Sequence, residues 1–290
     1  MTAKLLLVDG HAVAYRAFYA IRNLRTRDGR PTNAVYGFIN MLAQLRRQWQ
    51  PSHAVVVFDG GLPAERMALC PDYKAQREAM PEELRIQFDS ISDYLQAARV
   101  GAYRVDGEEA DDVLATVTAQ ATESGAAVLI ATHDKDLLQL VTDVVQVVSP
   151  TKSEERLGPQ EVKQKTGVYP DQIAEWLALI GDTADNISGV PGVGPKTAAR
   201  LLGQFQSVPG IYAHLNDISQ EKLRLNLAAH RDLVRRNMQL TQLRRDVRVP
   251  ADWQDWTWTE GDAGALLRFY REMEFHSMAR PLENPTLLDL

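Results

Sequence analysis

"KLLLVDG" (residues 4–10) is a continuous apolar run that stops at an acid and a glycine. Two further stretches, "HAVVVFDG" (53–60) and "AAVLIATHDKD" (126–136), have the same form. Short apolar runs rich in β-branched residues are typical of parallel strands that are buried on both faces. Four segments with helical periodicity alternate with them, at about 11–20, 33–49, 81–98 and 110–123. Strands that alternate with helices predict an α/β fold with a parallel sheet.

The pattern changes after about residue 150, where helical segments dominate. Pro159, Pro170 and Pro195 suit the first turns of such helices. We expect a short strand at "RRDVRVP" (244–250). The boundary between the α/β half and the mainly helical half should fall between residues 150 and 170. The expected helices are "GPQEVKQKTG" (158–167), "YPDQIAEWLALIG" (169–181), "PKTAARLLGQF" (195–205), "SQEKLRLNLAAHRDLVRRNMQL" (219–240) and "GALLRFYREMEF" (264–275).

The composition limits the class of protein. Cys70 is the single cysteine, so no internal disulfide is possible, and the six histidines are too scattered to suggest a zinc site. The apolar run at the N-terminus is too short for a signal peptide, and no run approaches a membrane span. We therefore expect a cytoplasmic protein. The net charge of −6 argues mildly against a nucleic-acid binder, unless many of the acids are concentrated in one place.

Acids follow all three expected strands. Asp9, Asp59 and the pair Asp134 and Asp136 lie at or just after the carboxyl ends of these runs. In open α/β sheets, ligands bind at that edge. Asp after a strand is also good turn and helix-capping chemistry, and for any single one of these acids that interpretation is favoured. Three strands that end alike favour a shared site.

"DGEEADDV" (106–113) places five acids within seven positions, directly before an apolar helical pattern. One or two acids in the first turn stabilise a helix through its dipole, but five acids so close together begin to repel each other. If the helix begins near Ala110, Glu109 and Asp112 share one face and Asp111 lies at the mouth of the turn. A divalent cation would turn this repulsion into coordination.

A further cluster, "GDTADN" (181–186), contributes two more acids, Asp182 and Asp185. Carboxylates without histidine or cysteine are ligands for Mg²⁺ or Mn²⁺. The set is too large for one Mg²⁺, and two ions about 3.5–4 Å apart, as in nucleases and polymerases, would use it. The candidate ligands are Asp9, Asp59, Glu109, Asp111, Asp112, Asp134, Asp136, Asp182 and Asp185.

"GVPGVGPKTAARLL" (189–202) nearly matches a phosphate-binding P-loop. Pro195 separates Gly194 from Lys196, and the segment follows an expected helix rather than a strand, so nucleotide binding is rejected. A glycine-rich turn between two helices is one interpretation. The other is a helix–hairpin–helix, in which backbone amides approach a phosphate and Lys196 and Arg200 lie one turn apart on the following helix. Such a device binds the DNA backbone without selecting bases.

Two basic segments remain. In "ERMALCPDYKAQREAMPEEL" (65–84), Tyr73, Lys74 and Arg77 have the charge and the aromatic ring to hold a phosphate and stack a base. A solvated mixed-charge helix explains that composition equally well. The second cluster lies in an expected loop, where a role facing solvent or phosphate is favoured over a place in the core. It consists of Arg22, Arg25, Arg27 and Arg30.

In this order, the motifs resemble the 5′-nuclease (flap endonuclease-like) family, most closely the N-terminal 5′–3′ exonuclease domains of bacterial DNA polymerase I enzymes. The resemblance runs from residue 5 to about residue 280, and the combination is far more specific than any single motif. The matching stretches are "LLLVDGHAVAYRAFYA", "PTNAVYGF", "VVFDG", "DYKAQR", "GEEADDVLATV", "HDKDLLQL", "GDTADNISGVPGVGPKTAARLL" and "REMEFHSM".

The resemblance implies a PIN-like nuclease core over residues 1–165, with a helical arch at about 62–90. A helix–three-turn–helix DNA-binding region would follow over 166–290. The resemblance also implies a division of the acids between two Mg²⁺ or Mn²⁺ ions. One ion would be held by Asp9, Asp59, Glu109 and Asp111, the second by Asp134, Asp136, Asp182 and Asp185, with Asp112 bridging or supporting.

The resemblance also assigns roles outside the carboxylates. Lys74 and Arg77 match arch positions that bind the scissile phosphate and, with Asp136, form the expected catalytic set. Tyr73 matches an aromatic that packs on the displaced end, while Cys70 stands where an aromatic is expected. The expected DNA contacts further include Arg16, Gly192, Gly194, Lys196 and Arg200. A K⁺ ion would be held by the main chain of Val190, Gly192 and Val193.

The implied activity is metal-assisted hydrolysis of DNA phosphodiesters at 5′ ends and 5′ flaps, in replication and repair. DNA would be bound without sequence specificity by a monomer, with a separately acting DNA polymerase as the protein partner. One alternative is a catalytically inactive DNA-structure-binding protein of this fold, which is disfavoured because no carboxylate position is lost. Another is a haloacid-dehalogenase-type phosphatase. That class needs a second acid two residues after its nucleophile, where this chain has Gly61.

Overall fold

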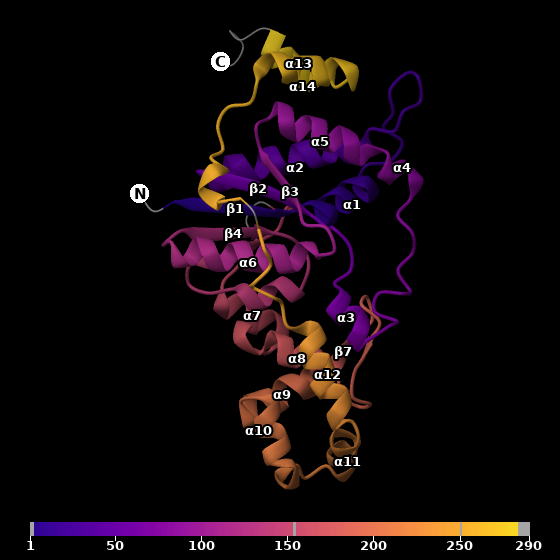
Figure 1. Cartoon of the computed structure of the whole chain (residues 1–290), viewed down its shortest axis with the longest axis vertical. Coiled ribbons are helices and arrows are strands. Elements are labelled where there is room, and N and C mark those ends of the chain that lie inside the picture. Colours follow the sequence, from indigo (N-terminus) through magenta and orange to yellow (C-terminus); the bar gives the residue numbers. More distant parts are fainter. Residues whose placement is uncertain (1–2, 153–154, 250, 284–290) are drawn as a thin grey trace.

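The computed structural model describes residues 3–152, 155–249 and 251–283. Its centre is a six-stranded sheet with the order β3-β2-β1-β4-β5-β6 (Figure 1). Neighbouring strands from β3 to β5 are parallel, and β6 is an antiparallel edge strand. The strands are β1 (Lys4–Asp9), β2 (His53–Phe58), β3 (Gly101–Arg104), β4 (Ala127–Ala131), β5 (Val145–Val148) and β6 (Arg156–Leu157). The predicted α/β class with a parallel sheet is confirmed.

Helices cover both faces of this sheet (Figure 1). Side chains alternate along a strand, so Leu6 and Val8 pack toward one helical layer while Leu5 and Leu7 pack toward the other. The first layer contains α1 (Gly10–Ala20), α2 (Asn33–Trp49) and α5 (Gln87–Ala97). The second layer contains α6 (Ala110–Glu123). Burial on both faces explains why the first strands appear in the sequence as unbroken apolar runs.

The segment between β2 and α5 crosses from the sheet to the helical half and back. Its first helix, α3 (Ala64–Leu69), packs on α12 (Arg231–Thr241). Its second, α4 (Glu82–Arg85), packs on α1. The range 62–90, where an arch is expected, contains two short helices, α3 and α4, and the start of α5, joined by turns and irregular chain along one side of the molecule (Figure 1).

The helical half follows β6 and contains a two-stranded ribbon of β7 and β8. The expected helix at 219–240 is in fact two helices, because His230 (φ −111°, ψ 23°) leaves the helical conformation between α11 and α12. The short helix η1 (Asp136–Leu140) comes earlier, between β4 and β5. The elements after β6 are α7 (Pro159–Thr166), η2 (Pro170–Gln172), α8 (Ile173–Ile180), β7 (Gly181–Asp182), β8 (Ile187–Ser188), α9 (Pro195–Phe205), α10 (Val208–Ala213), η3 (Leu215–Asp217), α11 (Glu221–Ala229) and α12.

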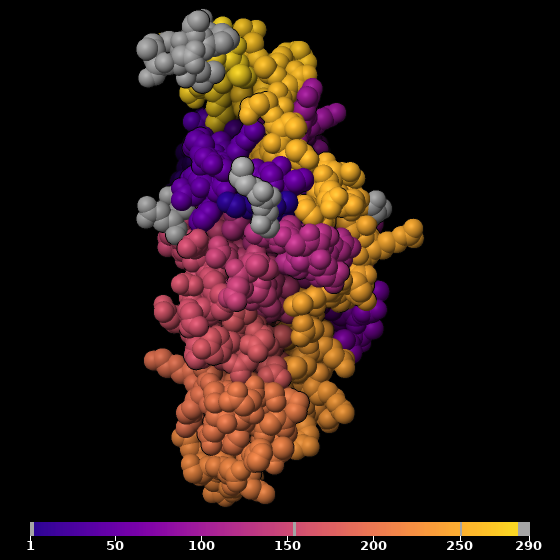
Figure 2. All heavy atoms as spheres, turned by 90° about the vertical axis from the view of Figure 1, so that its left-hand side faces the viewer, coloured from indigo at the N-terminus to yellow at the C-terminus, as the bar shows by residue number. Residues whose placement is uncertain are grey.

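After α12 the chain returns along α6 to the sheet half. Figure 2 shows this returning segment on the surface, between the helical end and the last helices. There η4 (Trp253–Asp255) is followed by α13 (Ala263–Glu272) and α14 (His276–Glu283). Helix α13 packs on α5, with the rings of Phe269 and Tyr94 5.9 Å apart. No helix among the described residues is long and apolar enough to cross a membrane.

The strand expected at 244–250 is wrong for residues 244–249, and residue 250 lies outside the described part of the chain. Two backbone amides in this segment donate to side chains of α6 instead of to a neighbouring strand. The amide of Arg244 donates to Asp112 (2.9 Å), and that of Val247 donates to the hydroxyl of Thr116 (3.2 Å). The alternating pattern therefore marks a segment bound to a helix.

Candidate active site

The acids that follow the strands meet at the carboxyl edge of the sheet. Asp9 ends β1 and caps α1, where it accepts a hydrogen bond from the amide of Ala12 (3.0 Å) and another from the hydroxyl of Thr132 (3.0 Å). Asp59 accepts a hydrogen bond from the amide of Ala110 (2.8 Å), at the start of α6. Capping and site formation are therefore compatible, because one carboxylate can do both.

A main-chain clasp fixes the spacing between Asp59 and the acids of α6. The amide of Gly60 donates to the carbonyl of Glu108 (2.8 Å), and the amide of Gly107 donates to the carbonyl of Gly60 (2.9 Å). A Cβ on Gly60 would overlap the carbonyl oxygen of Val105. Gly60 therefore allows two loops that are far apart in sequence to lie in direct backbone contact.

The edge opens into a cavity of 540 Å³, which we call the acid cavity. Both carboxylates and the basic side chains of Lys74 and Arg77 line it, so it can hold metal cations and the anionic oxygens of a phosphate ester together. It is lined by Asp9, His11, Ala12, Tyr15, Asp59, Lys74, Arg77, Glu78, Met80, Ala110, Asp111 and Asp134.

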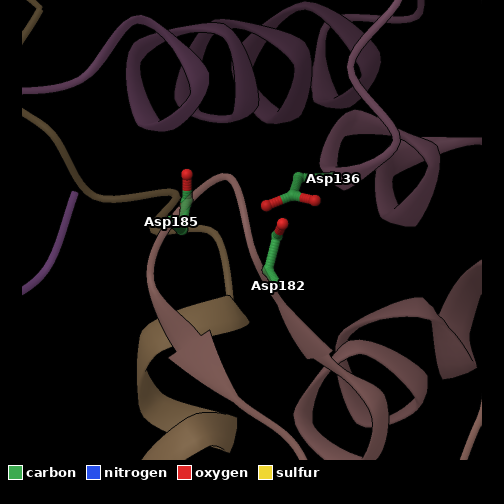
Figure 3. A group of neighbouring side chains, drawn as sticks. All are labelled: Asp136, Asp182 and Asp185. Carbon is green, nitrogen blue, oxygen red and sulfur yellow. The ribbon is translucent and has the colours of Figure 1, made fainter. Parts of the chain in front are cut away.

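A second group of acids lies nearby (Figure 3). Carboxylate oxygens of Asp136, Asp182 and Asp185 all lie within 4.8 Å of one another. Asp182 and Asp185 come from the β7–β8 ribbon, and the "GDTADN" loop thus joins the strand-end acids in space. Lys135 forms an ion pair with Asp182 (2.6 Å).

The residues present in this second group fit a divalent cation. One carboxylate oxygen of Asp136, Oδ1, is buried and has no hydrogen-bond partner among the described residues, since the ammonium of Lys135 lies 3.9 Å away, too far for a hydrogen bond. A buried oxygen without a donor is costly, and a cation would satisfy it. The donor set consists only of carboxylate oxygens, which suits Mg²⁺ or Mn²⁺.

The electrostatics of the acid cavity indicate the same need. Burial raises the pKa of Asp9 to about 7, and the charges of Asp59 and Asp134 act in the same direction. Burial, followed by the charges of Asp134 and Asp9, also holds the pKa of Asp111 well above its usual range. Carboxyls in this state cannot all ionise near neutral pH without a positive partner. A bound cation would supply that partner.

Lys74 and Arg77 bring positive charge to this set of acids. Lys74 forms ion pairs with Glu109 and, at 3.7 Å, with Asp185, while Arg77 pairs with Asp185 at 2.8 Å. Burial, the largest single influence, would lower the pKa of Lys74, but the charges of Glu109 and Asp185 and the hydrogen bond to Glu109 together raise that pKa. Lys74 also has a left-handed backbone (φ +56°) and donates its amide to the carbonyl of Asp185 (3.1 Å).

Tyr73 does not have the exposed ring that base stacking requires. Its relative exposure is 2%, and its hydroxyl lies 3.0 Å from Asp185 Oδ2 and 3.3 Å from both Glu109 oxygens. Burial, together with these two charges, raises the pKa of Tyr73. The ring packs in a small cluster with Cys70, Ile187 and Leu240. Cys70 therefore occupies a buried apolar position in place of the expected aromatic.

Arg66 is a residue of this region that the sequence did not single out. Its guanidinium is buried, pairs with both oxygens of Asp112 (2.7 and 2.8 Å) and also reaches Glu109. Asp112, at 0% exposure, is therefore bound by Arg66 rather than facing the acid cavity. Within a mixed-charge helix an arginine looks solvated, and only the packing of α3 on α12 reveals its burial.

The glycine hairpin precedes α9. Gly192 is exposed with φ +81°, and Gly194 is the N-cap residue of α9. Lys196 and Arg200 are exposed on that helix, and Arg200 also donates to Gln220 (3.3 Å). Val190 and Val193 are buried and joined by a backbone hydrogen bond of 2.9 Å.

The other basic side chains are partly engaged in ion pairs. Arg16 is exposed on α1. In the loop after α1, Arg25 pairs with Glu83 (2.5 Å) and Arg30 pairs with Glu272 (3.1 Å). Arginines of this loop therefore connect α1 to α4 and α13, in addition to facing solvent.

Comparison with protein families covers most of the chain. Residues 4–167 match the family model described as "5'-3' exonuclease, N-terminal resolvase-like domain". Residues 168–264 match the one described as "5'-3' exonuclease, C-terminal SAM fold". Together these two matches extend over well over half of the sequence.

Curated relatives are bacterial DNA polymerases. The chain is 37% identical over 289 residues to DNA polymerase I of Bacillus caldotenax, covering 99% of this chain and 33% of the relative. It is 40% identical over 280 residues to DNA polymerase I of Geobacillus stearothermophilus, covering 96% of this chain and 32% of that one. The chain thus spans about a third of the length of these relatives.

Solved structures share the fold. The D15 flap endonuclease of bacteriophage T5, in a complex with DNA and metal ions, has a TM-score of 0.66 at 21% identity, covering 96% of this chain and 97% of that one. The catalytic core of Rad2 in complex with DNA substrate has a TM-score of 0.65 at 15% identity, covering 98% and 92%. At these identities the likeness concerns the fold.

Proposed function

Because this chain belongs to the 5′–3′ exonuclease family, we propose that it hydrolyses DNA phosphodiesters at 5′ ends and 5′ flaps, with divalent cations as cofactors. The observation that carries this proposal is the convergence of buried acids with Lys74 and Arg77 at one cavity. Within the family the chain retains every acid that its motifs require, which disfavours an inactive DNA-binding role. Gly61 disfavours the phosphatase alternative.

We assign two sets of ligands. Asp136, Asp182 and Asp185 would hold one cation, since their oxygens lie together and one of them lacks a donor. The acids that line the acid cavity would hold the other, namely Asp9, Asp59, Asp111 and Asp134. This differs from the division expected from the sequence, because Asp134 lines the acid cavity and Glu109 does not. When bound, a divalent cation supplies Lewis-acid polarisation of the phosphate ester and neutralises charge. Mg²⁺ is our choice of metal.

Glu109 and Asp112 have a different role in this proposal. Both are buried against Arg66, and Glu109 also binds Lys74. We propose that Glu109 and Asp112 position the side chains of Lys74 and Arg66 beside the acid cavity. Asp112 therefore supports the site from behind, as one of the two roles expected for it from the sequence.

Lys74 and Arg77 would bind the scissile phosphate. Phosphate oxygens and carboxylates are the same kind of acceptor, so these side chains can exchange Glu109 and Asp185 for the ester. In that position their charges stabilise the negative charge that develops on the phosphate during hydrolysis. The ion pairs of Lys74 with Glu109 and Asp185 hold its side chain beside the acids.

The rest of the DNA would be held without base selection. Arg16, Lys196 and Arg200 are exposed and can bind backbone phosphates, and the amides near Gly192 and Gly194 lie at the N-terminus of α9. We retain the K⁺ site at the carbonyls of the hairpin as part of this proposal. A cytoplasmic location agrees with work on DNA and with a single reduced cysteine.

The test uses a duplex with a labelled 5′ flap, incubated with and without Mg²⁺. Cleavage near the junction that requires Mg²⁺ and is lost in Asp136→Asn is the expected result. Binding without cleavage in every metal would support the inactive alternative and overturn the enzyme proposal. Release of phosphate from small esters alone would favour a phosphatase.

A further inference from the structure

A second cavity, of 410 Å³, adjoins the acid cavity, and we call it the aromatic cavity. Three residues line both, which makes the two spaces neighbours: His11, Asp59 and Met80. The aromatic cavity has eight lining residues of its own, and neither the motifs nor the mechanism above uses it. Its remaining lining residues are Phe58, Arg85, Phe88, Asp89, Ser92, Ala102, Tyr103 and Arg104.

Three rings form a cluster in this cavity. The ring of His11 lies 4.8 Å from that of Phe88 and 5.7 Å from that of Phe58, while Phe58 and Phe88 are 5.9 Å apart. Phe88 and Phe58 are only half-buried, although each is a large apolar side chain. A Cβ on Gly10 would overlap Phe58, so the glycine after β1 leaves room for this ring.

The orientation of His11 is fixed by the site next to it. Its Nδ1 accepts a hydrogen bond from the amide of Asp59 (3.0 Å). That bond ties the ring cluster to one of the acids proposed to hold a cation. Whatever occupies the aromatic cavity therefore lies beside the place where the scissile phosphate would bind.

The mouth of the cavity has groups that suit a nucleotide. Arg85 and Arg104 are exposed, and each forms an ion pair with an exposed acid, Glu82 and Asp106 respectively. Such surface pairs are weak and are readily exchanged for phosphate. Ser92 and Asp89 are exposed and offer polar atoms to the edge of a base.

We propose that the aromatic cavity binds one nucleobase of the single strand whose phosphate lies in the acid cavity. This inference rests on the proposed function and deepens it by naming where the nucleoside next to the cleaved bond goes. Aromatic rings stack on any base, so the cavity would favour unpaired DNA without favouring a sequence. A paired base is already stacked within its duplex and cannot enter. The cavity would thus help to select a single-stranded 5′ end.

The first experiment measures binding of flap DNA in which 2-aminopurine replaces one base at a time near the junction. Ca²⁺ replaces Mg²⁺ so that the strand stays intact, and cleavage in Mg²⁺ is measured in parallel. We expect fluorescence to be quenched several-fold at one position on the 5′ strand. Phe88→Leu, which keeps the apolar volume but removes the ring, should restore the fluorescence at that position.

The second experiment removes the base itself at the quenched position. An abasic nucleotide should weaken binding by the wild-type protein about tenfold, since stacking on a side chain is worth about 1–3 kcal/mol per base. In Phe88→Leu the same change should matter less than about twofold. Arg104→Ala, which leaves the rings in place, should weaken binding of the intact flap severalfold.

Phe205→Leu is the matched control. Its ring is half-buried and stacks on His214 at 5.9 Å, far from both cavities in the helical half, so it should leave fluorescence and binding unchanged. Equal fluorescence at every position, together with normal cleavage in Mg²⁺, would overturn the base site and leave the nuclease proposal standing. Absence of cleavage of every 5′-ended DNA would instead overturn the proposed function.

Discussion

At the scale of single residues, the unusual feature is the set of carboxyls whose pKa is raised. Burial is the first cause at Asp9, Asp111, Asp134 and Asp136, and the charges of neighbouring acids add to it at all four. The free energy of unfolding is reduced when these groups are forced to ionise together. Affinity for a cation arises from the same repulsion, because binding the cation relieves it.

The stability of the metal-free protein should therefore depend on pH. The pKa of Asp9 is about 7 in the folded state against 3.8 as its ordinary value, so between these values the folded state binds more protons than the unfolded one. This contribution to stability is complete below pH 4 and is lost as the pH rises through about 7. Urea unfolding in EDTA should show this decline, and Mg²⁺ should reverse it. A decline that persists unchanged in Asp9→Asn would contradict the assignment.

Asp136→Asn should stabilise the metal-free protein and abolish its activity. The amide removes a buried charge whose pKa is raised by burial and then by Asp134. We expect a higher Tm in EDTA at pH 7.5, a smaller increase of Tm on adding Mg²⁺, and cleavage lowered by about 100-fold or more. Asp143→Asn, at an exposed acid outside the site, is the control. A lower Tm in EDTA would indicate that the charge is already compensated.

At the scale of elements, α3 is attached to its neighbours mainly through Arg66. Besides its pairs with Asp112 and Glu109, the guanidinium donates to the carbonyl of Leu240 (3.2 Å) in α12 and to that of Gln242 (3.3 Å). One side chain thus joins α3, the start of α6 and the end of α12. It fixes the near end of the segment that carries Lys74 and Arg77.

Arg66→Met should destabilise the protein strongly. The substitution leaves Asp112 and Glu109 buried and removes the guanidinium that pairs with Asp112. Removal of one partner from a buried ion pair costs about 3–5 kcal/mol. Urea unfolding should report that loss. Arg85→Met, in the exposed pair with Glu82, is the control and should leave the free energy of unfolding nearly unchanged. Equal effects of the two substitutions would show that Arg66 is not a structural clamp.

The elements differ in how far the sequence predicts them. Strands β1, β2 and β4 are central and buried on both faces, so their apolar runs and the helices after them are legible. Strand β3 has partly exposed residues and only four of them, which leaves no run to detect. The segment 244–249 has an alternating pattern, yet side chains of α6 take its backbone amides. Whether such a segment forms a strand depends on which groups accept its backbone hydrogen bonds, and the local sequence does not identify those groups.

At the scale of the whole molecule, acidic side chains are concentrated at the acid cavity, while the helical end exposes lysine and arginine side chains. The net charge of −6 is therefore a poor guide to DNA binding. Lys196 and Arg200 lie on α9, at the opposite end of the molecule from α13 (Figure 1). DNA that reached both the cavity and α9 would contact the molecule along much of its length.

Lys196→Ala should weaken DNA binding and reduce its dependence on salt. If Lys196 neutralises one phosphate, the slope of log K against log salt should fall by about 0.9 in magnitude. Fluorescence anisotropy with a flap duplex at several KCl concentrations measures this. The control is Arg268→Ala, which removes an exposed arginine of α13 and should leave the slope unchanged. An unchanged slope for Lys196→Ala would remove α9 from the DNA-binding surface.

The site shows the same division between what the sequence reveals and what it conceals. The acids were predictable because strand ends converge at one edge and because crowded charge in "DGEEADDV" calls for a counter-ion. The burial of Tyr73 and Arg66 was not, since both depend on how α3 packs on α12. The aromatic cavity combines side chains from α1, α5, β2 and β3, and no local pattern announces it.

The clasp at Gly60 fixes the spacing between the loop of Asp59 and the start of α6 through main-chain contacts, which cannot adjust as side chains can. A cation held by the proposed ligands across this spacing would be selected by its ionic radius. Mg²⁺ and its oxygen ligands lie about 2.0–2.1 Å apart, whereas Ca²⁺ requires about 2.3–2.6 Å and more ligands. Ca²⁺ would be attracted by the same negative charge and yet hold the phosphate ester farther from the acids than Mg²⁺ would. If the proposed ligands hold the cation, the backbone contact at Gly60 would therefore make cation size, and not charge alone, a condition of cleavage.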